Sequence, residues 1–106
     1  MEKRVETAML ELKRGLQELY GRRLKGVYLF GSHARGAADQ ESDVDALVVL
    51  DSVGHYAGQI DRTSHLVFRL SLKYSLSISR VFVAEADWLS GENTFLFNVR
   101  EEAVAV

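Results

Sequence analysis

Two patterns of apolar and polar positions occur along the chain: stripes at helical spacing and short continuous apolar runs. A change from one pattern to the other marks the boundary between predicted elements. Residues 2–20 have one apolar stripe at the three- and four-residue spacing of an amphipathic helix: Val5, Ala8, Met9, Leu12, Leu16 and Leu19. Gly21 follows at the position where many helices end. Residues 24–30 (LKGVYLF) and 44–50 (VDALVVL) are short continuous apolar runs bounded by small and polar residues, which is typical of buried strands.

The second half of the chain repeats these two patterns. Residues 58–74 have a second helical stripe, and residues 76–84 (LSISRVFVA) form a third strand candidate. Glu85 begins a short turn or helix. A short helix near 95–100 and a terminal strand at 103–106 complete the predicted elements. The order of elements predicts an α/β (α+β) fold in which helices pack on a small mixed sheet.

Length and composition narrow the class of protein. The chain has 106 residues, which fits a single domain over 1–106 with one core and an open cleft as its site. It has no cysteine, so a bound metal must be held by oxygen or imidazole. Its net charge of −2 argues against a broad nucleic-acid surface. No segment approaches the roughly 18 apolar residues of a membrane span, and the amino terminus does not resemble a signal peptide, which predicts a cytoplasmic protein.

Two aspartates stand at the start of the second strand candidate. Because alternate side chains of a strand share a face, Asp43 and Asp45 should project together while Val44 points away. Two neighbouring carboxylates repel one another, and a hard divalent cation removes that cost. The alternative is that both aspartates are solvated residues at the end of a loop. The pair alone does not decide between these interpretations.

A glycine and a serine follow the first strand candidate in the segment FGSHARG. Gly31 allows close approach of the backbone to a phosphate, and Ser32 is expected to N-cap a short helix through His33, Ala34 and Arg35. The helix N-terminus would attract an anion, and Arg35 would add a forked cationic donor. The alternative is a capped helix with Arg35 in a surface ion pair. His33 fits a phosphate contact and an exposed helix start equally well.

Together the two segments resemble a known family. The stretch GSHARGAADQESDVDALVVL (31–50) is similar to the signature of minimal nucleotidyltransferase domains: Gly-Ser-x-(Ala)-Arg-Gly, a loop, then Ser-Asp-x-Asp and an apolar strand. These domains belong to the DNA polymerase β-like nucleotidyltransferase superfamily. The tail NVREEAVAV (98–106) is similar to their Asn-(Val/Ile)-Arg-x-Glu-(small)-Val ending. The resemblance therefore covers most of the chain.

The resemblance implies a role for each residue of the motif. Gly31 and Ser32 would bind the β- and γ-phosphates of a nucleoside triphosphate such as ATP. Asp43 and Asp45 would be the catalytic carboxylates and would ligate Mg²⁺. Arg35 would support the phosphate site or hold the helix.

The resemblance also implies a partner. Many such short domains are antitoxins of HEPN-domain toxins, and some transfer AMP to a tyrosine of the toxin. The resemblance therefore predicts an Mg²⁺-dependent adenylyltransferase that acts on a HEPN-type toxin.

The chain departs from the pattern at one position. The superfamily commonly supplies a third carboxylate from a later strand, but SISRVFV (77–83) contains no aspartate or glutamate. Ser77, Ser79 or Arg80 occupies the expected position, and Glu85 and Asp87 are the next carboxylates along the chain. Two other functions stay open: a non-catalytic antitoxin that docks on its partner, and transfer to a small molecule.

Overall fold

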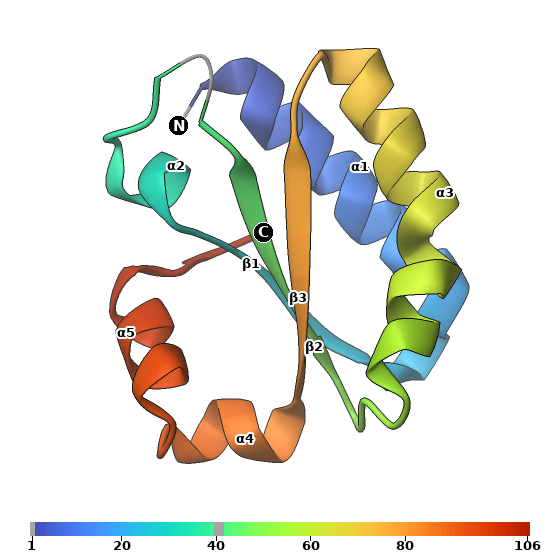
Figure 1. Ribbon diagram of the computed structural model, residues 1–106, viewed down its shortest axis with the longest axis vertical. Coiled ribbons are helices and arrows are strands. Elements are labelled where there is room, and N and C mark those ends of the chain that lie inside the picture. Colours follow the sequence, from blue (N-terminus) through green and yellow to red (C-terminus); the bar gives the residue numbers. More distant parts are fainter. Residues whose placement is uncertain (1, 40–41) are drawn as a thin grey trace.

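The computed structural model describes residues 2–39 and 42–106, and the chain is shown in Figure 1. Its elements are α1 (Lys3–Tyr20), a 3₁₀ turn (Gly21–Arg23), β1 (Leu24–Phe30), α2 (Ser32–Arg35), β2 (Val44–Leu50), α3 (Tyr56–Tyr74), β3 (Ile78–Ala84), α4 (Glu85–Ser90), α5 (Thr94–Glu102) and β4 (Val104–Ala105). Across these two ranges, no helix is both long enough and apolar enough to cross a membrane. Residues 40 and 41, in the stretch between the glycine–serine turn and the aspartate pair, lie outside the described residues.

The predicted strands over 24–30 and 44–50 coincide with β1 and β2, and the short helix predicted after Ser32 is α2, which begins one residue earlier, at Ser32 itself. The predicted boundaries were less accurate where a single backbone hydrogen bond sets the start of a helix or strand, because the apolar pattern does not show such bonds. α3 begins at Tyr56 instead of residue 58, because the ring nitrogen Nδ1 of His55 caps it by accepting the Gly58 N–H. β3 begins at Ile78 instead of residue 76, because the N–H of Leu76 still donates to a carbonyl at the end of α3.

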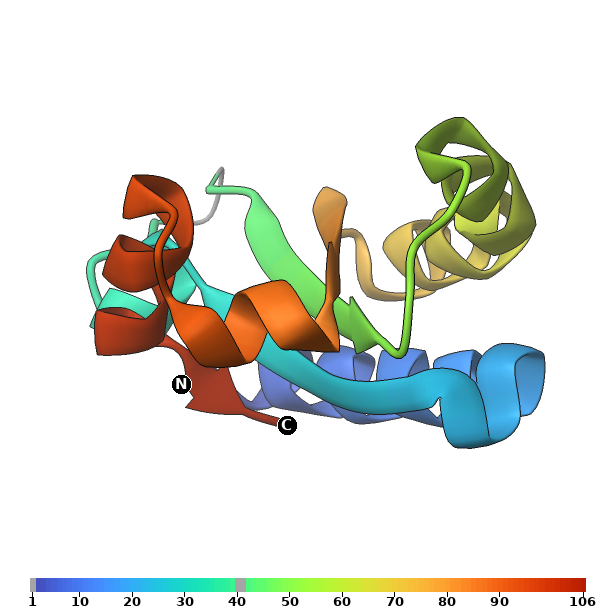
Figure 2. The ribbon, with the colours of Figure 1, turned by 90° about the horizontal axis from the view of Figure 1, so that it is seen from below.

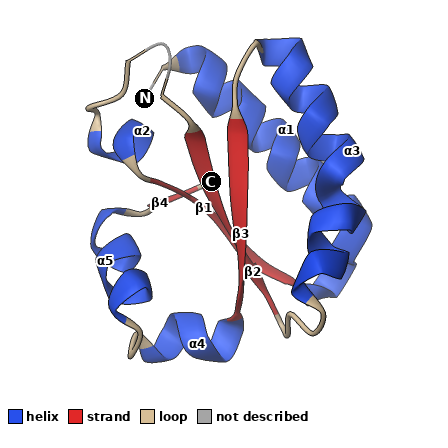
Figure 3. Cartoon of the chain, in the orientation of Figure 1, coloured by secondary structure: helices blue, strands red, loops and turns tan. Residues whose placement is uncertain are grey.

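The four strands of the described chain form one mixed sheet in the order β3-β2-β1-β4 (Figure 3). β1 runs antiparallel to β2 and to β4, whereas β2 and β3 are parallel. A parallel pair needs a long crossover connection, and α3 supplies it here. The antiparallel pairing of β1 and β2 places the end of β1 beside the start of β2.

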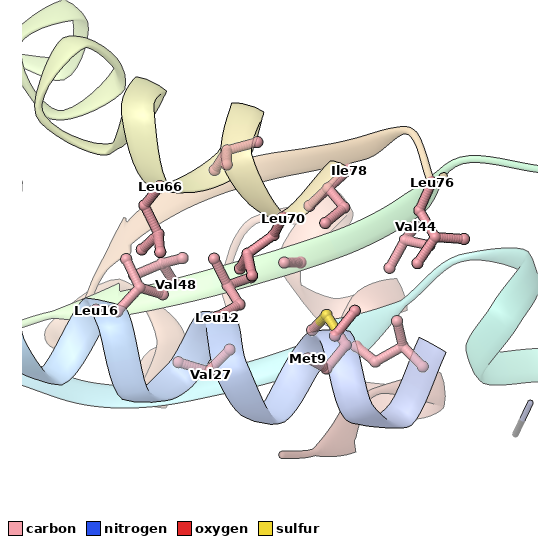
Figure 4. Close-up of a cluster of buried hydrophobic side chains, with 14 of the residues drawn as sticks. Met9, Leu12, Leu16, Val27, Val44, Val48, Leu66, Leu70, Leu76 and Ile78 are labelled. Atoms are coloured by element: carbon pink, nitrogen blue, oxygen red, sulfur yellow. The ribbon is translucent and has the colours of Figure 1, made fainter. Parts of the chain in front are cut away.

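One face of the sheet is covered by α1 and α3, which run side by side (Figure 1). The main core lies between these helices and the sheet, and Figure 4 shows side chains from both layers meeting there: Met9, Leu12 and Leu16 from α1, Leu66 and Leu70 from α3, and Val27, Val44, Val48 and Ile78 from the sheet. Gly15 allows the close approach of the helices, because a Cβ at this position would overlap the side chain of Leu66.

The opposite face is covered by α4 and α5, which lie on the other side of the sheet from α1 (Figure 2). A smaller apolar cluster fills this layer: Leu47, Val49, Val83, Leu96 and Val99. Alternation along β2 therefore sends its even-numbered residues to the main core and its odd-numbered residues to the smaller cluster. Asp45 is one of the odd-numbered residues, so it projects on the face covered by α4 and α5. It is not part of the apolar cluster that fills the rest of this layer.

Candidate functional site

The two segments singled out from the sequence meet at one end of the β1–β2 pair. Phe30, the last residue of β1, is paired with Asp45 near the start of β2. The next residue, Gly31, therefore lies against the carboxylate of Asp45, and a Cβ on Gly31 would overlap Asp45 Oδ2. The structure thus brings the small-residue turn into contact with Asp45 of the aspartate pair.

Gly31 has a backbone conformation that only glycine adopts readily. Its φ of 77° and ψ of −157° lie in a region that a side chain makes strongly unfavourable. This conformation turns the chain from β1 directly into α2. The prediction that Ser32 N-caps this helix was wrong: Gly31 occupies the cap position, and Ser32 is the first helical residue of this described segment, without a capping side-chain bond. The Ser32 hydroxyl is therefore not used as a cap.

A glutamate from the end of α5 contacts the turn. The Gly31 N–H donates to Glu102 Oε1 at 3.0 Å, and Arg35 Nη1 donates to Glu102 Oε2 at 3.0 Å. Both contacts lower the pKa of Glu102, with the Arg35 hydrogen bond as the larger cause, so the carboxylate is ionised at neutral pH. Glu102 was not among the predicted site residues, although the glutamate of the tail motif falls on this position.

The aspartate pair is electrostatically unfavourable without a cation. Asp43 is exposed just before β2, and Asp45 is half-buried. Burial raises the pKa of Asp45, and the negative charge of Asp43 raises it further, while His33 and Arg35 act in the opposite direction. His33 also links the turn to the aspartates, because its Nε2 donates to the Ser42 carbonyl at 3.1 Å.

The donor set fits Mg²⁺ better than a metal held by protein groups alone. Within residues 2–39 and 42–106, no group of three or more histidine, aspartate or glutamate side chains is arranged to hold a metal. Mg²⁺ is commonly held by one or two carboxylates together with substrate phosphates and water. Asp43 and Asp45 offer two carboxylates whose mutual repulsion a divalent cation would relieve.

The register of β3 locates the position of the absent third carboxylate. Asp45 is paired with Ser79, so Ser79 and Val81 lie on the same face of the sheet as Asp45. Of the β3 residues on that face, these two are nearest the aspartates. Ala84 is five residues beyond Ser79, about 16 Å along the strand. Glu85 and Asp87 follow Ala84 and therefore lie at the far end of β3 from Asp45.

Arg80 was another candidate for that position, but it lies on the opposite face of the sheet. Its Nε donates to the buried Thr63 hydroxyl at 3.0 Å, and its Nη2 donates to the Ile60 carbonyl at 2.8 Å. These contacts hold β3 against α3. Arg80 is therefore a structural residue in this fold.

Replacing Arg80 by methionine is expected to lower the free energy of unfolding by about 2 kcal/mol, because its charged hydrogen bonds to Thr63, Ile60 and Ser64 of α3 are lost. ATP affinity should stay unchanged. Urea unfolding and a nucleotide titration measure the two effects, with the exposed α3 residue Arg69 replaced by methionine as the control. A loss of ATP affinity without a loss of stability would contradict this structural role.

An open cleft lies further along the face that carries Asp45. It has a volume of about 490 Å³ and is lined by residues of β3, α4 and α5, including Val81, Asp87, Asn93 and Phe95. Val81 connects the cleft to the aspartates, because it is two residues along β3 from the partner of Asp45. The candidate site therefore continues into a space that is open to a second molecule.

Comparison with known proteins identifies the family. The model of the nucleotidyltransferase domain family matches residues 9–87, which include the glycine–serine turn and both aspartates. The chain belongs to the nucleotidyltransferase family. This nucleotidyltransferase is 36% identical over 98 residues to a Methanocaldococcus jannaschii protein provisionally named a protein adenylyltransferase, and the match covers 92% of each chain. A second relative from that organism, with the same provisional name, is 35% identical over 67% of this chain and 71% of its own length.

Solved structures share the fold of this nucleotidyltransferase at lower identity. A structure described as a minimal nucleotidyltransferase matches with a TM-score of 0.61 and 22% identity, over 96% of this chain and 95% of the other. A toxin–antitoxin crystal structure with AMP-PNP matches with a TM-score of 0.60 and 22% identity, over 94% of this chain and 70% of that one. The predicted mixed α/β nucleotidyltransferase fold is thus confirmed, as is the family resemblance.

Proposed function

We propose that this nucleotidyltransferase transfers AMP from ATP to a hydroxyl of a partner protein in an Mg²⁺-dependent reaction. The observation that supports the proposal is the contact between the Gly31 turn and Asp45, because the proposed phosphate-binding segment and a proposed metal ligand are then neighbours. The provisional names of the relatives support adenylyl transfer to protein. The likeness to a toxin–antitoxin structure that contains AMP-PNP supports an antitoxin role.

The reaction joins the acceptor hydroxyl oxygen to the α-phosphorus of ATP. The bond from that phosphorus to the bridging oxygen breaks, and pyrophosphate leaves. Asp43 and Asp45 would hold the Mg²⁺, which when bound supplies positive charge against the charge that develops on the phosphates. Ser32 would bind the departing phosphates through its hydroxyl and its first-turn N–H, and Arg35 would add a charged donor to them.

The acceptor is proposed to be a tyrosine of a HEPN-type toxin, which makes the chain an antitoxin. A protein substrate suits an open site, because a large partner can bring its own hydroxyl to the aspartates. The cleft between β3, α4 and α5 lies on the same face and offers that partner a surface next to the site.

A second candidate function is neutralisation of the partner by docking alone. The observation that favours it is Ser79, which stands beside Asp45 where a third carboxylate would accept the proton of the attacking hydroxyl. In this case the site would bind nucleotide and metal without transferring AMP.

Co-purification with the product of the adjacent gene separates the two candidates. With Mg²⁺ and ATP labelled in the α-phosphate, we expect label on the partner, and we expect EDTA to abolish it because both carboxylates act through the metal. The Asp43→Asn/Asp45→Asn double variant should give no label. Absence of label with the wild type, combined with neutralisation that survives the double substitution, would favour docking alone.

A further inference from the structure

Glu102 joins the C-terminal part of the chain to the turn that follows β1. It is the last residue of α5, and it lies outside the segment that matches the family model. Its two carboxylate oxygens bind different parts of one short segment: the backbone of Gly31 before α2 and the side chain of Arg35 at the end of α2. One rigid group therefore spans both ends of the turn.

The Gly31 contact changes how the turn can bind phosphates. The Gly31 N–H already donates to Glu102, so it is not a free donor for a phosphate. The resemblance to the family had implied that Gly31 would bind the phosphates. The same hydrogen bond holds the Phe30–Gly31 peptide, one residue before Ser32, while the Arg35 contact holds the other end of α2. Glu102 therefore anchors the segment that contains Ser32 from both sides.

The contact with Glu102 orients the guanidinium of Arg35 and uses one of its nitrogens. Only one guanidinium nitrogen, Nη1, donates to Glu102, and about half of the Arg35 side chain is exposed (52%). The other nitrogens are directed by the rigid, planar fork of the guanidinium once Nη1 is held. An arginine held in this way loses less conformational entropy when it binds a phosphate.

We propose that Glu102 is a positioning residue for the triphosphate of the nucleotide: it holds the Gly31 peptide and the Arg35 guanidinium so that Ser32 and Arg35 present their donors to the β- and γ-phosphates. The inference rests on the proposed function, because it needs the turn to be the phosphate site. Repulsion between Glu102 and the phosphates acts in the opposite direction. It is weakened because the carboxylate remains paired with Arg35, which leaves the pair with no net charge.

The test compares two nucleotides on Glu102→Gln. The probes are the α,β-methylene analogue of ATP, which binds but cannot transfer AMP, and AMP, which lacks the β- and γ-phosphates. With Mg²⁺, we expect the affinity for the ATP analogue to fall about 10-fold, because glutamine is uncharged and has one acceptor oxygen, so it cannot accept from both Gly31 and Arg35. The affinity for AMP should stay within about twofold of wild type, a pattern that a general loss of structure would not produce.

Two further variants separate position from charge. Glu101→Gln removes the same charge from the neighbouring exposed residue of α5, and it should bind both probes like the wild type. Glu102→Asp keeps the charge but is one methylene shorter, so it cannot reach both donors and should also lose affinity for the ATP analogue. Circular dichroism of each variant checks that it is folded, and Glu102→Asp carries the test if Glu102→Gln is not.

The outcomes distinguish this inference from the proposed function. If the wild-type protein does not bind the ATP analogue, the proposed function fails, and this inference fails with it. If the wild type binds and Glu102→Gln binds equally well or more tightly, only the positioning role is overturned. Equal losses for the ATP analogue and for AMP would also overturn it, because the effect would not depend on the β- and γ-phosphates.

Discussion

Asp45→Asn is expected to reduce AMP transfer by about 100-fold or more, because metal-assisted charge stabilisation contributes several kcal/mol to such reactions. An asparagine keeps the shape of the side chain but loses the negative charge that would hold Mg²⁺. The measurement is the rate of label transfer from ATP to the co-purified partner. Isothermal titration with Mg²⁺ and the α,β-methylene analogue of ATP should show weakened binding in the same variant.

The same substitution should not lower stability in the absence of metal. Burial and the neighbouring Asp43 raise the pKa of Asp45, so its ionised form is less favourable in the folded chain than in the unfolded chain. Below its unfolded-state pKa this group favours the folded state, and the benefit is lost as the pH rises through the folded-state pKa. At neutral pH, asparagine removes the unfavourable negative charge that Asp45 carries in the folded chain. Urea unfolding at pH 7 therefore should give an unfolding free energy equal to or above that of wild type.

Asp61→Asn is the matched control for both measurements. Asp61 is an exposed aspartate on α3, away from the α4–α5 face, so neither transfer nor nucleotide binding should change. Full transfer activity in Asp45→Asn would remove Asp45 from the metal site.

Gly31→Ala is expected to lower the free energy of unfolding by about 3 kcal/mol and to abolish nucleotide binding. Two effects add at this position. The backbone lies in a glycine-only region, and the new methyl group would overlap Asp45 Oδ2. Relief of the overlap requires the turn and the carboxylate to separate, which would dismantle the contact that carries the proposed function. Urea unfolding and titration with the ATP analogue measure the two losses.

Gly36→Ala is the matched control for Gly31→Ala. Gly36 ends the same short helix with a positive φ of 72°, but a Cβ there meets no atom within 4 Å among the described residues. We expect it to cost about 1 kcal/mol, which is the usual cost of a left-handed conformation for alanine, without loss of nucleotide binding. Equal effects of the two substitutions would mean that backbone strain alone matters and that the contact with Asp45 does not.

Local patterns were sufficient to predict most elements of this fold. β1 and β2 were predicted with the observed bounds, and α2 to within one residue, because continuous apolar runs and small-residue turns are local signals. The capping of α3 by His55 and the late start of β3 depend on single backbone hydrogen bonds, which periodicity does not contain. Ser32 as N-cap failed for a similar reason: a serine after a glycine is a good capping candidate, but the φ of Gly31 moved the cap one residue earlier.

The site was predictable in part. Gly31, Ser32, Arg35, Asp43 and Asp45 lie within one short stretch of sequence, and their residue types indicate phosphate and metal chemistry. Glu102 lies 67 positions from Arg35 along the chain, and its contact depends on where α5 packs. The exclusion of Arg80, Glu85 and Asp87 from the position of a third carboxylate beside Asp45 also needed the register of β3.

By itself, then, the sequence determined the helices and strands and the family, because periodicity and a compact motif are properties of neighbouring residues. The tertiary structure decided which distant groups meet. The antiparallel pairing of β1 and β2 sets Gly31 against Asp45, and the parallel register of β3 puts Ser79 beside that aspartate. The packing of α5 brings Glu102 to the turn. Such contacts join residues that are far apart in the sequence. They therefore depend on the order of strands in the sheet and on helix packing, which local patterns do not reveal.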